Sequence, residues 1–177
     1  VAGSRNWDGA AVDVGAVTWG NGSTGTTGAV SSANSLIGSS ANDQVGYIGN
    51  FGITVLTNGN YVVRTTFWDG GATDVGAVTW ANGSTGISGV VSSANSLVGS
   101  TAMDYVGQNG LVPLTNGNYV VASGTWGTSD FGAVTWCDGT TGRSGTISSS
   151  NSLVGSASND LVGYNGVTAL TNGNYVV

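Results

Sequence analysis

Short segments of alternating apolar and polar residues recur along this chain, and three of them are identical. The sequence LTNGNYVV occupies residues 56–63, 114–121 and 170–177. Asn and Gly accept the left-handed backbone of a tight turn, and the Tyr-Val-Val run suits an extended strand. Each copy therefore predicts a β-hairpin.

The residues around the first hairpin predict four strands. One enters the hairpin at 53–56, one leaves it at 61–68, the GAVTW segment at 76–80 forms the third, and 89–98 forms the fourth. The polar centre of the fourth segment indicates a sheet edge or a wetted face. No segment has a 3.6-residue apolar period, so we expect almost no helix.

The GAVTW segment also predicts how its tryptophan is placed. Val78 and Trp80 lie two residues apart and share one face of the strand. A Trp beside Val on a strand is typical of a core. We therefore expect this series to be buried; it comprises Trp19, Trp80 and Trp136.

The spacing of the shared segments divides the chain into repeats at 1–63, 64–121 and 122–177, with a three-residue insertion in the first near Ile48 to Phe51. We expect an all-β fold with three repeats of a four-stranded antiparallel sheet. Packing like the blades of a β-propeller is the first interpretation; a three-sided β-prism and a β-solenoid are the alternatives. A closed propeller normally has about four or more blades, so three imply further assembly or the prism.

The composition argues against several classes of protein. Charged residues make up only 7% of the chain, Lys, Glu and His are missing, and the net charge is −6. Without a basic face, the chain is not expected to bind nucleic acid or an anionic membrane surface. No apolar run approaches the ~20 residues of a membrane span, so we expect no membrane insertion.

Catalytic side chains are scarce. Without His and Lys, the Ser-His-Asp and Ser-Lys arrangements cannot form. The nine Asp follow the repeat and are not gathered at one site, and the single Cys137 is replaced by Gly20 and Ala81 at the equivalent positions. The sequence therefore predicts that the protein is not an enzyme.

Two kinds of binding site are worth testing. Asp13, Asp74 and Asp130 precede the third strand and are candidate calcium ligands, although turn formation explains them more simply and no cofactor is expected. A second tryptophan series, next to Asp and Gly, could stack on sugars with one site per repeat. The residues of this candidate glycan site are Trp7, Asp8, Trp68, Asp69 and Trp126.

The order of segments carries a resemblance. The chain repeats, in order, segments such as LTNGNYVV, GAVTW, NGSTG and SANSLVGS, followed by Asp-x-Val-Gly. This succession resembles the Gly/Asn-rich tandem repeats of large bacterial surface proteins of the filamentous-haemagglutinin type. The resemblance covers the whole chain and implies a non-enzymatic, extracellular or cell-surface module. A structural or adhesive function is the first hypothesis, and a multivalent lectin is the alternative.

The two ends of the chain hold matching parts of one strand. Val1 occupies the position of Val62, and Val177 occupies the position of Val63. We expect self-association through Val1 and the strand Tyr175, Val176 and Val177. The strand is completed either by the same chain, closing a ring, or by a neighbour, forming a head-to-tail filament.

Overall fold

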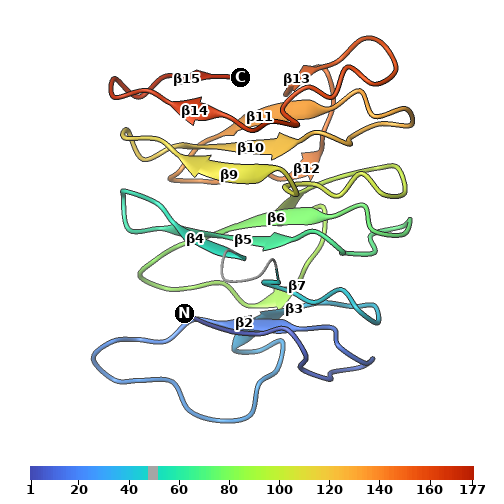
Figure 1. Ribbon diagram of the computed structural model, residues 1–177. Helices are drawn as coiled ribbons and strands as arrows, with labels where there is room; N and C mark the ends of the chain where they lie inside the picture. Colours follow the sequence, from blue (N-terminus) through green and yellow to red (C-terminus); the bar gives the residue numbers. More distant parts are fainter. Residues whose placement is uncertain (48–51) are drawn as a thin grey trace.

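The computed structural model describes residues 1–47 and 52–177. Figure 1 shows small sheets stacked on one another from the N-terminus to the C-terminus, with the two termini at opposite ends of the stack. The described residues form strands and turns and contain no helix. This confirms the prediction of an all-β chain built from repeats of an antiparallel sheet.

Each layer of the stack is one sheet, and the first two sheets also gain an edge strand from the following repeat, as described below. The first layer contains β1 (Ala2–Ser4), β2 (Ala16–Thr18) and β3 (Ser35–Ile37). The second contains β4 (Ile53–Val55), β5 (Tyr61–Thr65), β6 (Ala77–Ala81) and β8 (Ser96–Val98). The third contains β9 (Gly110–Pro113), β10 (Tyr119–Ser123), β11 (Ala133–Cys137) and β13 (Leu153–Val154), and it is followed by the hairpin of β14 (Thr168–Ala169) and β15 (Tyr175–Val176).

The repeated hairpins form as predicted. In the first, the Leu56 amide donates to the Asn60 carbonyl over 2.8 Å, and the Gly59 amide donates to the Leu56 carbonyl over 3.0 Å. Gly59 has φ of +87°, the left-handed conformation for which glycine is suited. The strand leaving the hairpin then pairs antiparallel with the GAVTW strand, with Val62 opposite Trp80.

The expected fourth strand at 89–98 is wrong as a single element. It is two short strands in different layers: β7 (Gly89–Val90) pairs parallel with β3 of the layer before, and β8 pairs antiparallel with β6. Its polar centre forms a turn, because the Asn95 side-chain oxygen accepts the Ser92 amide at 2.9 Å. The next repeat does the same, since β12 (Gly145–Thr146) pairs parallel with β8.

The hydrophobic core lies between the layers. Val17 and Leu36 of the first layer pack with Val63 and Ala77 of the second in one cluster. Val62 and Val78, on the opposite face of the second layer, pack with the third layer in another cluster. The second sheet is therefore buried on both faces, like a blade in an open stack. No ring of layers closes within the described residues.

The layers do not begin at the repeat boundaries that the sequence suggested. The boundary after residue 63 falls inside β5, and the boundary after residue 121 falls inside β10. The second and third layers each start with the hairpin, because both hairpin strands pair within the same sheet. The expected insertion near Ile48 to Phe51 lies outside the described residues.

Candidate functional site

The tryptophan of the first two GAVTW segments contacts the next layer. Trp19 donates its indole Nε1–H to the carbonyl oxygen of Gly83 over 2.9 Å, and Trp80 donates in the same way to Gly139 over 2.9 Å. These partners are 64 and 59 residues apart in sequence. We call each such pair a tryptophan contact.

A glycine makes room for each indole. A Cβ atom added to Gly86 would lie 2.5 Å from the Cβ of Trp19, and one added to Gly142 would lie 2.5 Å from the Cβ of Trp80. The equivalent residue of the first layer, Gly25, has no atom within 4 Å of such a Cβ. The space that an indole fills twice inside the stack is therefore open at the N-terminal layer.

The burial predicted for this tryptophan series needs correction. Trp19 and Trp80 are half-buried, and Trp136 is 37% exposed. The strand phase itself is right, because Trp80 packs against the core cluster that contains Val78. The rings sit at the rim of the layers, where they reach the following loop, so the next layer decides how far each one is covered.

The other tryptophan series is a poor sugar platform. Trp68 exposes only 6% of its surface and belongs to the core between the first two layers, so the expectation of an exposed ring is wrong there. Trp7 and Trp126 are half-buried. The accompanying carboxylates form turns: Asp8 accepts the Asp13 amide at 2.8 Å, and Asp69 accepts the Asp74 amide at 2.7 Å.

Two members of a third Asp series, Asp43 and Asp104, connect the layers. The buried Asp43 carboxylate accepts the amides of Ser39 and Ser40 in its own layer and the Asp69 amide of the next, at 2.7 to 2.9 Å. Asp104 repeats this arrangement and accepts the Gly127 amide of the third layer at 2.8 Å. Its regular position before Val-Gly was the available signal in the sequence.

Asp13, Asp74 and Asp130 have positive φ values of 51°, 54° and 54°. Asn and Asp tolerate this conformation because they form local hydrogen bonds, which fits a role in shaping turns. Burial and the nearby Asp69 charge raise the pKa of Asp74. Among the described residues, no group of three or more His, Cys, Asp or Glu side chains is placed to hold a metal ion.

Cys137 lies in the core on β11 and is fully buried. Burial raises the pKa of its thiol to about 12, so the thiolate needed for nucleophilic attack is scarce at neutral pH. The residue belongs to the cluster between the second and third layers. It therefore serves as a small apolar side chain.

The residues expected to drive assembly lie at the two ends of the stack. Val1, Val176 and Val177 expose 56%, 55% and 49% of their surface. The Tyr175–Val176 strand pairs with β14, and the N-terminal strand β1 pairs with β2 at the other end. The chain's own N-terminal segment does not complete the C-terminal strand, because the termini lie at opposite ends of the stack (Figure 1).

Comparison with known families identifies the repeat. A family model described as a repeat of unknown function (DUF5650) matches residues 1–47, 55–108 and 113–164, three tandem copies that together cover most of the chain. The chain belongs to this repeat family. No curated protein and no solved structure matches it. In the described part of the chain, no helix is long and apolar enough to cross a membrane.

Proposed function

We propose that this chain is a non-enzymatic structural or adhesive module, extracellular or at the cell surface, that assembles head to tail by stacking its end layers. The observation that carries the proposal is that the two ends present opposite halves of the contact that joins layers inside the chain. The tandem repeats and the scarcity of charge support an architectural role, as does the resemblance to filamentous-haemagglutinin-type surface proteins.

One leucine in each of the strands β3, β8 and β13 shows how the C-terminal face matches the faces inside the stack. Leu36 and Leu97 are fully buried because the next layer covers them, whereas the equivalent Leu153 is 57% exposed. Covering a leucine of this kind contributes roughly 1.5 to 3 kcal/mol. The C-terminal face thus has the apolar surface that a further layer would bury.

The polar contacts are also split between the ends. At the C-terminal end, the Trp136 indole is exposed. At the N-terminal end, a Cβ atom added to Gly22 or Gly25 would meet no atom within 4 Å, whereas one added to the equivalent Gly83 or Gly86 would meet neighbouring atoms. Stacking would bring the Trp136 indole over Gly25 and its Nε1–H toward the Gly22 carbonyl. This would be a third tryptophan contact, formed between two chains.

Backbone edges match in the same way. β3 and β8 each gain a parallel strand from the following repeat, β7 and β12 respectively. Among the described residues, β13 has no such parallel partner, and residues 28–29, equivalent to β7, lie in no strand. An unpaired strand edge of this kind is a template for pairing with another chain.

One overlap must be resolved on docking. Val176 and Val177 occupy the repeat positions of Val1 and Ala2, so only one of these pairs can fill the position in a stacked assembly. The C-terminal hairpin would supply the hairpin strands that the first layer lacks. We therefore expect deletion of Val176 and Val177 to strengthen association.

Sedimentation velocity over a range of protein concentrations tests the proposal. We expect open-ended, concentration-dependent association that is lost in Leu153→Asp. The matched control is Val55→Asp, which changes a residue that is 68% exposed in β4, away from the end faces. A chain that stays monomeric at every concentration, or equal loss of association in both variants, would contradict head-to-tail stacking.

A further inference from the structure

Two equivalent cavities lie along one flank of the stack. One has a volume of about 430 Å³ and is formed where Trp80 and Asn95 meet the loop of the next layer at 141–144. The other, of about 290 Å³, is formed where Trp19 and Asn34 meet the loop at 85–88. The same structural unit therefore builds a cavity at each of these two layer junctions.

Neighbouring cavities share lining residues. Thr85, Gly86 and Ile87 line both of them. A third cavity, of about 350 Å³, shares Trp19 and Asn34 with the second. We call this series of adjoining cavities the flank groove, and we define it by Trp19, Thr26, Asn34, Trp80, Thr85 and Ile87.

We propose that the flank groove binds an extended, uncharged glycan that contacts Trp19 and Trp80 together. The Trp19 and Trp80 cavities form at layer junctions inside the chain, so they differ from the contact between end faces and from the Trp7, Trp68 and Trp126 series. The proposal does not depend on head-to-tail assembly, because both indoles belong to one chain.

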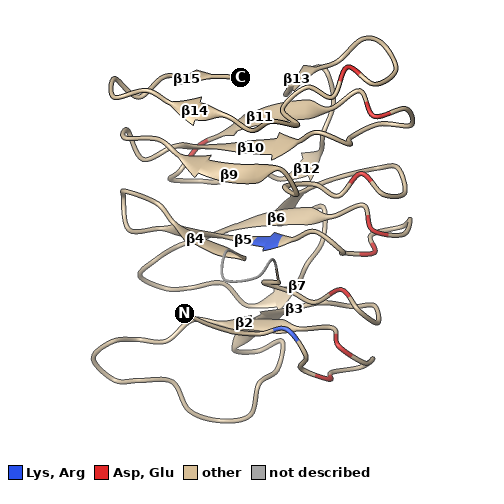
Figure 2. Cartoon of the chain, viewed as in Figure 1, with Lys and Arg blue, Asp and Glu red and all other residues tan. Residues whose placement is uncertain are grey.

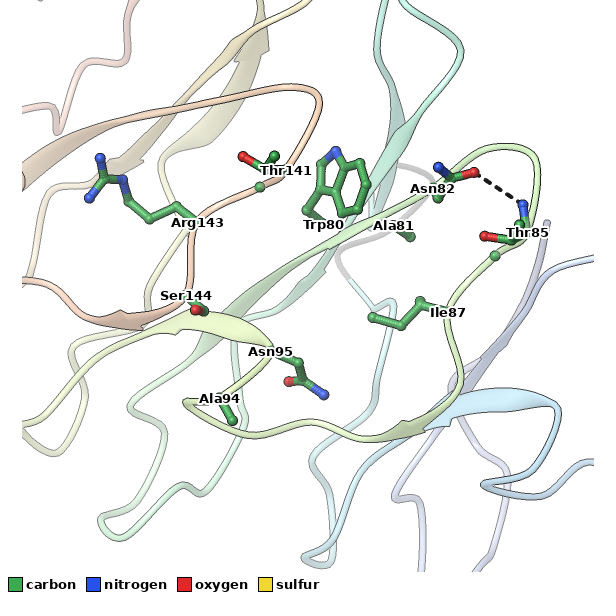
Figure 3. A pocket seen from close by; sticks show the side chains of 12 residues that line it. Trp80, Ala81, Asn82, Thr85, Ile87, Ala94, Asn95, Thr141, Arg143 and Ser144 are labelled. Carbon is green, nitrogen blue, oxygen red and sulfur yellow. Dashed lines mark hydrogen bonds between the residues drawn. The ribbon is translucent and has the colours of Figure 1, made fainter.

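The indoles are held rigidly and are still accessible. The Nε1–H of Trp80 donates to the Gly139 carbonyl, and the Cβ and Cγ atoms of Trp80 lie against Gly142. The Trp80 side chain is nevertheless only half-buried. Figure 3 shows Trp80 between the loop that carries Thr141 and the loop that carries Thr85 and Ile87. A fixed aromatic face loses little entropy when a ligand stacks on it.

The lining suits a ligand that is both apolar and rich in hydroxyl groups. Trp80 and Ile87 provide apolar surface, and Thr85, Thr141 and Ser144 provide hydroxyls beside it. Pockets with aromatic walls and a few placed polar groups bind small ligands, and sugars combine apolar C–H faces with hydroxyls.

Charge favours a neutral ligand. Among the described residues that line the three cavities, no side chain is acidic and Arg143 has the single cationic side chain. Figure 2 shows most of the carboxylates gathered in the loops at one edge of the layers, on the right of the view. A polyanion would meet one arginine on a chain of net charge −6, which is weak attraction.

The repeat of the groove favours an extended ligand. Sheets packed face to face are about 10 Å apart, so the two indoles follow one another at this interval along the stack. A linear oligosaccharide can contact both, whereas a disaccharide fills one cavity. The second contact is then intramolecular and raises the apparent affinity.

Fluorine NMR of the chain labelled with 5-fluorotryptophan tests the proposal, with each resonance assigned from a Trp→Phe variant. The probes are cellohexaose, chitohexaose, laminarihexaose and mannohexaose, each compared with its disaccharide. We expect at least one hexasaccharide to shift the Trp19 and Trp80 resonances, and to bind about tenfold or more tightly than its disaccharide. No shift with any probe, or shifts only at Trp7, Trp68 or Trp126, would overturn the assignment.

A matched pair of variants checks the location. Thr85 is exposed and lines both cavities, and its one hydrogen bond within the described part of the chain is from its backbone amide to Asn82. Thr85→Arg places a long side chain in the groove and should weaken hexasaccharide binding by about tenfold or more, whereas Thr85→Ser should leave it within about twofold. Equal binding by both variants, with unchanged melting curves, would show that the glycan does not lie in the groove.

Discussion

The indole Nε1 of Trp80 donates a 2.9 Å hydrogen bond to the carbonyl oxygen of Gly139, in a different layer of the stack. The same carbonyl accepts the side-chain amides of Asn58 and Asn60, each at 2.8 Å. The hairpin of one layer, its GAVTW strand and the loop of the next therefore meet at one oxygen atom. This junction fixes the register between layers.

The first prediction concerns that hydrogen bond. Trp80→Phe keeps an aromatic ring and removes the N–H, so we expect the free energy of unfolding to fall by about 0.5 to 1.5 kcal/mol. Trp136→Phe is the control, because Trp136 is exposed at the last layer, and it should change little in dilute monomer. Urea denaturation measures both, and equal losses would argue against a stabilising Trp80 contact.

The second prediction concerns the carboxylate that joins two layers. Asp104→Ala leaves three backbone amides without their acceptor, so we expect a loss of about 2 to 4 kcal/mol in the free energy of unfolding. The equivalent Asp160 accepts two amides of its own layer and is exposed. Asp160→Ala should therefore cost clearly less, and the reverse order would refute an inter-layer role for Asp104.

The third prediction concerns pH. Burial raises the pKa of Asp43 above 3.8, although amides of Ser40, Asp69 and Ser39 oppose this, and the Asp69 charge adds to it. A carboxyl with a raised folded-state pKa contributes stability below its unfolded pKa and loses that contribution as the pH rises through the folded pKa. We expect the stability of the wild type relative to Asp43→Asn to decrease from below pH 3.8 toward neutrality.

Asp160 provides a control of opposite sign. Amides of Ala157 and Ser156 lower its pKa, so its contribution is present above the unfolded pKa and is lost as the pH falls through the folded pKa. The stability of the wild type relative to Asp160→Asn should therefore increase as the pH rises. Equal slopes for the two variants in acid-titrated urea melts would show that burial does not govern Asp43.

The fourth prediction concerns Cys137. Its burial and raised pKa, about 12, should make the native thiol react far more slowly with a maleimide than the thiol of the urea-unfolded chain. Mass spectrometry measures the adduct over time. Cys137→Ala, which restores the residue of Ala81, should fold and show no adduct. Rapid labelling of the native protein would place the thiol at the surface.

The fifth prediction concerns metal. Because Asp13, Asp74 and Asp130 act in turns, excess EDTA or added calcium should leave the melting temperature unchanged in calorimetry. The melting temperature of an Asp74→Asn variant should likewise be unchanged by EDTA and by calcium. A decrease of several degrees with the chelator would make calcium binding the better interpretation.

Local chemistry explains what the sequence determined by itself. The hairpins at LTNGNYVV, the GAVTW strand with Val78 and Trp80 on one face, and the number of repeats depend on turn residues and on a two-residue alternation. These properties act over a few residues, so the sequence carries them directly. The scarcity of catalytic side chains is likewise a matter of composition.

The tertiary structure decided what depends on residues far apart in the chain. The polar segment at 89–98 divides between two layers because Asn95 forms a turn and β7 finds its partner in the preceding layer. Trp80 is half-buried and Trp136, at the equivalent position, is 37% exposed, since the loop of the next layer contacts the Trp80 ring. Asp43 and Asp69, 26 residues apart, meet only after the sheets stack. Alternation along a strand says which residues share a face, but only packing determines what covers that face.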